Sequence, residues 1–146
     1  MFKIKNHFIL GVLSGLPSAF IGGILNSIEY KLGLIDVKYN QIATALFLPK
    51  SKKNEFCGSI IRYIIICMIS TFIGYVLTLS GRRNATGKTI GIVLASWALS
   101  VELIPKFLLN MRIRKPLYHY LTFLDHVLSA IVISRIILKF ARFRYI

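Results

Sequence analysis

The sequence predicts an all-α integral membrane protein, in which four transmembrane helices form a bundle and a short interfacial helix lies between the first two. Three observations predict this fold class. The 146 residues are 55% hydrophobic, with a mean hydropathy of +0.67, and they contain four apolar windows of the roughly 20 residues that a spanning helix needs. The formal net charge is +14, and most basic residues lie between these windows. Runs such as Ile64-Ile65-Ile66 are apolar on every face, which excludes the alternating pattern of a membrane β-barrel.

The four windows are residues 8–28, 58–79, 89–109 and 117–138. We interpret residues 1–146 as a single polytopic membrane domain. The longest connection, residues 29–55, is too polar in its middle for a lipid-facing span. Its later part, residues 41–48, is apolar and is followed by Pro49. We expect this part to form a short interfacial helix lying on the membrane; a re-entrant segment is the alternative.

Small residues recur every fourth position in the first window, on two adjacent rows of one helix face. The residues of this predicted helix-packing face are Gly11, Gly15, Ser18, Ala19, Gly22, Gly23 and Asn26. Such rows let helix backbones approach closely in lipid, where dispersion contacts drive association. A similar row, Gly91, Ala95 and Ala98, lies in the third window. We interpret the first-window face as a packing surface; a solute path lined by backbone is the alternative.

Ionisable residues in the third and fourth windows predict a polar intramembrane network. Its members are Glu102, Lys106, His119, Asp125 and His126. Glu102 and Lys106 are four residues apart, in the order that favours a helical ion pair. Asp125 and His126 lie near the centre of their window, where an ionisable group costs about 2.5–3.5 kcal/mol and therefore faces protein or water. We expect Glu102, Asp125 and His126 to meet, either as a clamp that fixes helix packing or as a proton or ion site.

Basic residues near the window ends predict contacts with anionic lipid headgroups, at about 1 kcal/mol each. These residues are Lys50, Lys52, Lys53, Arg82, Arg83, Arg112, Arg114 and Lys115. Arg62 and Arg135 lie close enough to window ends to reach the interface by snorkelling. Lys and Arg divide evenly between the two sides, so the positive-inside rule gives no orientation. The compact basic clusters of the Arg82-Arg83 loop and the C-terminal tail favour cytoplasmic termini. We expect no nucleic-acid partner.

Motifs for catalysis, nucleotides and metals are not matched. The segment from Gly81 to Thr89 resembles a phosphate loop, but five residues separate its glycines where the motif has four, and it follows an apolar helix. His119 and His126 are two helical turns apart, about 10 Å, which is too far to share one ion without a bend. We therefore expect no enzymatic activity, no cofactor and no metal.

The first half of the chain resembles a known family. A glycine-rich first window ends in Gly22-Gly23-Ile24, with Tyr30 shortly after, and the connection ends in Phe47-Leu48-Pro49 before a Lys-rich turn and Gly58. This layout resembles the YqhR-type conserved membrane proteins of Bacillus-like bacteria, with the second half similar only in its number of spans. That family has no assigned activity. The resemblance therefore implies a bacterial four-span membrane protein and carries over no functional residue.

The sequence thus predicts a small non-enzymatic, multi-pass protein of the plasma membrane. We expect it to act as a structural or interaction subunit, in a homo-oligomer or a larger membrane complex. The alternative is an oligomeric channel or transporter that surrounds Glu102, Asp125 and His126. An intramembrane enzyme is a third and weaker hypothesis.

Overall fold

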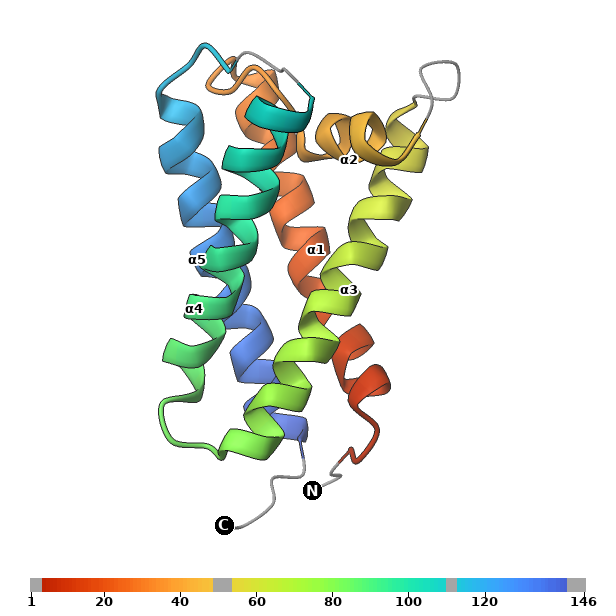
Figure 1. Cartoon of the computed structure of the whole chain (residues 1–146), viewed down its shortest axis with the longest axis vertical. Coiled ribbons are helices and arrows are strands. Elements are labelled where there is room, and N and C mark those ends of the chain that lie inside the picture. Colours follow the sequence, from red (N-terminus) through yellow and green to blue (C-terminus); the bar gives the residue numbers. More distant parts are fainter. Residues whose placement is uncertain (1–3, 49–53, 110–112, 142–146) are drawn as a thin grey trace.

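The structure, a computed structural model, describes residues 4–48, 54–109 and 113–141. Its elements are α1 (His7–Lys31), α2 (Tyr39–Phe47), α3 (Glu55–Ser80), α4 (Ala85–Trp97), η2 (Ala98–Leu108) and α5 (Leu117–Phe140). Helices α1, α3 and α5 run along the long axis with the continuous pair α4–η2, and α2 lies across one end (Figure 1). The predicted fold class, four long apolar helices plus a short helix between the first two, is confirmed.

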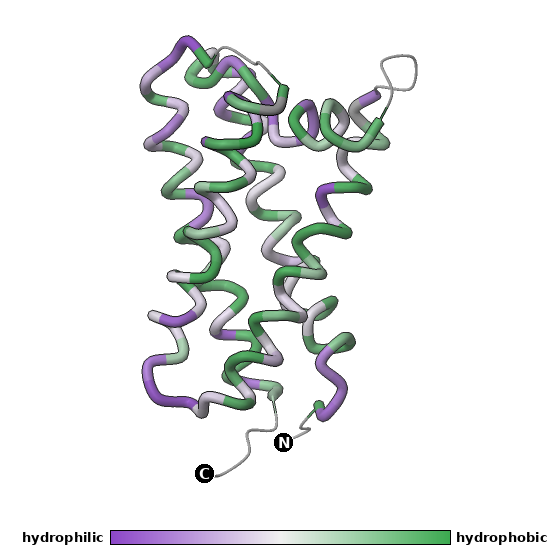
Figure 2. The backbone as a smooth tube through the Cα atoms, viewed as in Figure 1, coloured by the Kyte–Doolittle hydropathy of each residue, from purple (hydrophilic) through white to green (hydrophobic). Residues whose placement is uncertain are grey.

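Four helical segments are long and apolar enough to cross a membrane. They are His7–Lys31, Phe56–Ser80, Ala85–Phe107 and Leu117–Phe140. Hydrophilic residues gather at the two ends of the bundle, and the middle is mostly hydrophobic (Figure 2). Large apolar side chains also face outward, such as Met68 and Phe72, which are 67% and 57% exposed. The protein is therefore a multi-span helical membrane protein whose outer surface contacts lipid.

Local sequence explains where the helices begin and end. The side chain of Asn6 accepts hydrogen bonds from the backbone of Phe8 and Ile9, and Asn54 accepts one from Cys57. Each such N-cap contributes about 1 kcal/mol by satisfying N–H groups that have no partner within the helix. Helix α3 ends at Gly81, whose φ of 77° lies in the region that favours glycine.

The third span is not one continuous α-helix. It begins as α4 and continues from Ala98 to Leu108 as a π-helix, η2, which contains Pro105. Proline has no N–H to donate and its ring clashes with the carbonyl four residues earlier, so the α-helical ladder is disfavoured around Pro105. The wider π turn removes the four-residue stacking on which the Glu102–Lys106 ion pair depends.

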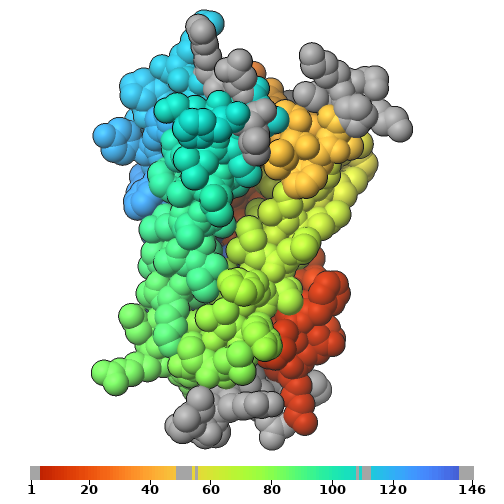
Figure 3. All heavy atoms as spheres, viewed as in Figure 1, coloured from red at the N-terminus to blue at the C-terminus, as the bar shows by residue number. Residues whose placement is uncertain are grey.

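The helices close the bundle on three sides. Helix α1 packs most extensively against α3 and also against α5, and α4 packs against α5, whereas α3 and α4 meet over a small area. Helix α2 packs on α3 and touches η2. The surface is hollowed between η2 and α3, just below α2 (Figure 3). The bundle is therefore open on the side where α3 faces the third span.

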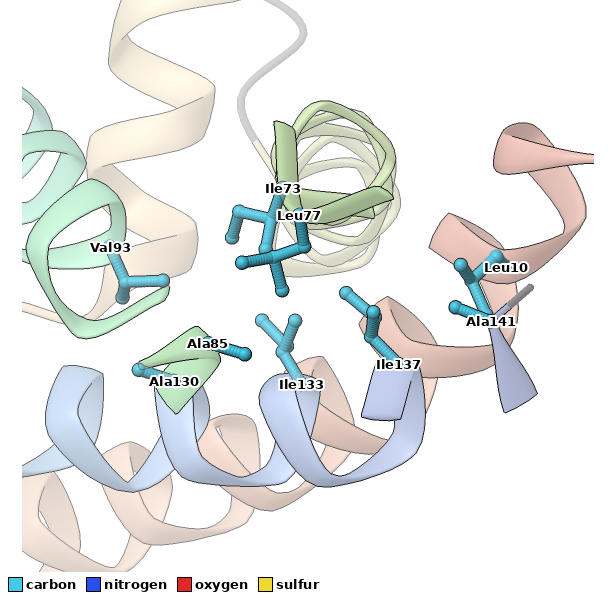
Figure 4. Packing of buried hydrophobic residues seen from close by; sticks show 9 residues of the cluster. All are labelled: Leu10, Ile73, Leu77, Ala85, Val93, Ala130, Ile133, Ile137 and Ala141. Atoms are coloured by element: carbon cyan, nitrogen blue, oxygen red, sulfur yellow. The ribbon is translucent and has the colours of Figure 1, made fainter. Parts of the chain in front are cut away.

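Two apolar clusters stabilise the bundle. The larger one joins α1, α3, α4 and α5 through nine buried residues (Figure 4), namely Leu10, Ile73, Leu77, Ala85, Val93, Ala130, Ile133, Ile137 and Ala141. The smaller one lies near α2 and comprises Ile35, Val37, Ile42, Val101 and Tyr118. Close packing in both clusters fixes the helices that carry the polar groups described next.

Candidate functional site

The predicted packing face of α1 lies against helices of the same chain. A Cβ atom built on Gly15 would lie 2.9 Å from the Cα atom of Cys67, and one on Gly11 would overlap Thr71, so both glycines permit close contact with α3. The Ser18 hydroxyl donates to the Ser129 carbonyl of α5 over 3.5 Å. The rest of the face is also inside the bundle: Ala19, Gly22 and Asn26 are buried and Gly23 is half-buried. The face is therefore occupied within one chain.

A cavity of about 130 Å³ lies beneath α2, on the open side of the bundle. Its lining is mostly apolar and includes Ile42 and Val101 of the smaller cluster and Val93 and Ile133 of the larger one. The polar and ionisable side chains that also line it are Ser18, Tyr39, Arg62, Ser96, Ser100, Asp125, His126 and Ser129. An apolar cavity with a few convergent polar groups is the usual form of a small-molecule site.

Tyr39, the first residue of α2, joins three helices at this cavity. Its backbone N–H donates to Oδ1 of Asn26 in α1 over 3.0 Å, and its phenol donates to Oδ2 of Asp125 in α5 over 3.2 Å. Its ring also meets the edge of His126 at a centroid distance of 5.5 Å. Burial, together with the negative charge of Asp125, holds the pKa of Tyr39 well above its ordinary value. The phenol therefore keeps its proton and remains a donor.

Arg62 of α3 enters the bundle, whereas snorkelling to the interface was expected. It is 9% exposed, and its Nη2 donates to the Ala19 carbonyl of α1 over 2.6 Å. Its guanidinium occupies the space that a side chain at Gly23 would need. The physical reason is this charge-assisted hydrogen bond to a carbonyl on a glycine-rich helix face, which replaces contact with water. Its Nε atom is buried and has no hydrogen-bond partner among the described residues.

His126 points its Nδ1 toward the Thr122 carbonyl, 2.7 Å away on the same helix. A carbonyl only accepts, so Nδ1 carries the proton of this hydrogen bond. The Thr122 hydroxyl accepts from the Trp97 indole of α4 over 3.2 Å and donates to the Tyr118 carbonyl over 2.8 Å. This chain of contacts ties the third and fourth spans together beside the cavity.

The five residues of the predicted polar network separate into two groups and one single residue. Asp125 and His126 line the cavity. Glu102 instead contacts Nδ1 of His119 over 2.6 Å, with side chains 29% and 42% exposed. Lys106 lies over the Phe107 ring, 5.4 Å from its centroid. The expected meeting of Glu102 with Asp125 and His126 does not occur, because Glu102 pairs near the end of the bundle with a histidine at the start of α5.

The predicted headgroup residues that the structure describes lie near the two ends of the bundle. Arg82 donates from Nη2 to the Leu138 carbonyl over 3.1 Å, and Arg83 is exposed beside it. At the other end, the Arg114 backbone N–H donates to Asp36 over 2.7 Å and the Lys115 ammonium donates to the Gly33 carbonyl. Lys50, Lys52, Lys53 and Arg112 lie outside the described residues.

The site offers a carboxylate, an imidazole, a phenol and a guanidinium around one small space. These groups are able to hold a proton or to bind a small polar solute. Within residues 4–48, 54–109 and 113–141, no three His, Cys, Asp or Glu side chains gather in a way that fits a metal ion. Comparison with family models, with curated proteins and with solved structures finds no match for this chain.

Proposed function

We propose that the protein is a non-enzymatic subunit of a plasma-membrane assembly, and that a second copy of the same chain is its partner. The observation that carries this proposal is the uncovered third span. Of its most apolar window 17% is buried, against 28–33% for the other three spans. Its outward face carries Gly91 and Ala95, and a Cβ atom on Gly91 would meet nothing within 4 Å.

The spacing of small residues on this outward face supports a second copy as the occupant. Gly87, Gly91 and Ala95 are exposed and spaced by four, which is the spacing that lets two helix backbones approach closely in lipid. A face packed against its own copy across a two-fold axis needs no second specialised surface. The comparable rows on α1 are already covered by α3 and α5, whereas a Cβ atom on Gly91 of α4 meets nothing within 4 Å among the described residues.

The role of the cavity side chains agrees with this proposal. Tyr39, Arg62 and Asp125 each bond to another helix of the same chain, which is what a buried polar clamp requires. The resemblance to YqhR-type membrane proteins adds the proposal that the chain is bacterial. Basic residues at both ends would then anchor the bundle to anionic headgroups.

The oligomeric state in a mild detergent tests the proposal. Wild type is expected to be a dimer or a higher oligomer, and Gly91→Leu is expected to weaken association at least tenfold without loss of helical content. Ile64→Phe adds volume at a lipid-facing position of α3 that is 54% exposed, and serves as the matched control. A wild-type chain that is monomeric, or a Gly91→Leu variant that associates like wild type, would contradict the proposal. Capture in a defined complex of other proteins would replace the second copy with a different partner.

The cavity favours a second candidate function, a channel or transporter with a proton or ion site. Asp125 and His126 lie within one chain beside a space of about 130 Å³ that opens between α3 and the third span. Ionisable groups inside a membrane protein commonly mark such pathways. The two candidates make different predictions for ion flux in an Asp125→Asn variant.

A further inference from the structure

A second hollow, separate from the cavity, lies between α1 and α3 near the end of the bundle that carries α2. We call it the α1–α3 groove; its volume is about 360 Å³. Its polar lining comprises Ser27, Lys31, Asn40, Ser59, Arg62 and Tyr63. Its apolar lining includes Phe20, Ile24 and Ile28, which are 59%, 45% and 48% exposed on the outer face of α1.

The charge of the α1–α3 groove is positive. Lys31 and Arg62 line it, and none of the described residues in its lining is Asp or Glu. Asp125 lines the cavity and not the groove, whereas Arg62 lines both. A concave site with two cations and no carboxylate attracts an anion and repels a cation.

Arg62 gives the α1–α3 groove a fixed cation. The side chain is 9% exposed and is held in place by the bond from Nη2 to the Ala19 carbonyl. Phosphate oxygens match the geometry of a guanidinium group.

The start of α2 lies at the polar end of the α1–α3 groove. Asn40, in the first turn of α2, donates from Nδ2 to the Ser59 hydroxyl over 2.8 Å, and both residues line the groove. The positive end of α2 lies at the same place and adds to the attraction for an anion.

We propose that the α1–α3 groove binds the headgroup of an anionic phospholipid from the surrounding leaflet. The phosphate contacts the two cations of the groove lining, Arg62 and Lys31. One acyl chain lies along Phe20, Ile24 and Ile28. Lys31 is the last residue of α1, and Phe20, Ile24 and Ile28 precede it toward the middle of the bundle, which matches the order of headgroup and chain in a bilayer.

Native mass spectrometry of the chain in mild detergent tests this proposal by lipid titration. Phosphatidylglycerol and phosphatidylcholine with the same acyl chains are compared, and glycerol phosphate serves as a headgroup without chains. We expect one phosphatidylglycerol to bind at least fivefold more tightly than phosphatidylcholine, and glycerol phosphate to compete only at concentrations about 100-fold higher. Equal binding of both lipids, or tight binding of glycerol phosphate alone, would overturn the assignment of a lipid site.

Two variants separate the α1–α3 groove from general attraction to a basic protein. Lys31→Gln is expected to weaken phosphatidylglycerol binding about fivefold, the effect of one cation near an anionic headgroup. Lys106→Gln removes an exposed cation near the same end of the bundle but outside the groove, and is expected to leave binding unchanged. Equal losses in both variants would overturn the proposal.

A third variant tests whether lipid binding needs the open volume of the α1–α3 groove as well as its positive charge. Ser27→Leu fills the α1–α3 groove and keeps both cations, so phosphatidylglycerol binding is expected to fall at least tenfold. Unchanged binding would overturn the proposal. Arg62→Gln would also remove the contact with Ala19, so Lys31→Gln and Ser27→Leu, which keep that contact, provide the test.

Discussion

The phenol of Tyr39 donates a hydrogen bond to the Asp125 carboxylate across 3.2 Å, and this bond ties α2 to α5 over the cavity. The two residues are 86 positions apart in the sequence. The Tyr39 backbone N–H is bonded at the same time to Asn26 of α1. Tyr39 therefore positions the start of α2 against two of the spanning helices. A substitution at Tyr39 is expected to weaken the packing of α2 on the bundle.

Replacing Tyr39 by phenylalanine tests this role. Tyr39→Phe keeps the ring contact with His126 and removes the donor to Asp125, so the free energy of unfolding is expected to fall by about 1–3 kcal/mol. Thermal melting in detergent measures the loss, and hydrogen exchange is expected to rise in α2 first. Tyr120→Phe, at a position of α5 that is 72% exposed, is the matched control. Equal effects of the two substitutions would contradict the positioning role.

The stability of the folded protein at alkaline pH is expected to depend on the Tyr39 phenol. Because burial raises its folded pKa above the unfolded value, the stability it contributes is complete below the unfolded pKa of about 10 and is lost as the pH rises toward the folded pKa. Melting temperatures measured between pH 8 and pH 12 are expected to fall more steeply above pH 10 for wild type than for Tyr39→Phe. Parallel curves for the two proteins would show that the Tyr39 phenol is not buried as described.

Asp125→Asn separates the clamp from the conducting pathway. The amide still accepts from Tyr39, but a hydrogen bond to a charged group becomes a neutral one, so a loss of about 1 kcal/mol in stability is expected. In reconstituted vesicles the clamp predicts no proton or ion flux in wild type or variant. Flux in wild-type vesicles that disappears in Asp125→Asn, while the oligomer stays intact, would contradict the clamp and establish the second candidate function.

Gly15 is expected to tolerate no side chain. A Cβ atom there would lie 2.9 Å from the Cα atom of Cys67, so Gly15→Leu forces α1 away from α3 and is expected to cost about 3 kcal/mol or more. Gly91→Leu is the matched control, because a Cβ atom on Gly91 meets nothing within 4 Å. Melting of the monomer at high detergent concentration measures both. A Gly15→Leu variant as stable as Gly91→Leu would show that α1 and α3 are farther apart than described.

The sequence predicted the elements better than the contacts between them. Four windows of about 20 apolar residues have few other structures available in a bilayer, and the predicted spans agree with the helices within a few residues at each end, apart from a third span that starts four residues early. The short helix was predicted at residues 41–48 and is Tyr39–Phe47. The internal form of the third span does not follow from its length and hydropathy, since the helix becomes the π-helix η2 from Ala98 onward.

The polar contacts were harder to predict because they depend on tertiary structure. Tyr39 lies two residues before the predicted short helix at 41–48, and a tyrosine at the start of a short amphipathic helix is the one sequence signal that points to it. Arg62 has the sequence position of a snorkelling residue, and only the approach of α1 brings the Ala19 carbonyl within reach. Glu102 was expected to meet Asp125, but it contacts His119, which lies two helical turns closer to the start of α5.

Cysteine cross-linking in native membranes tests the central claim, that α4 packs against α4 of a second copy, most directly. In a background with Cys57→Ser and Cys67→Ala, Gly91→Cys and Ile64→Cys are oxidised in parallel. A disulfide needs Cα atoms within about 7 Å, a distance that only a close helix–helix contact provides. We predict a cross-linked dimer for Gly91→Cys and none for Ile64→Cys. Absence of the Gly91→Cys dimer, or equal cross-linking at both positions, would contradict the claim.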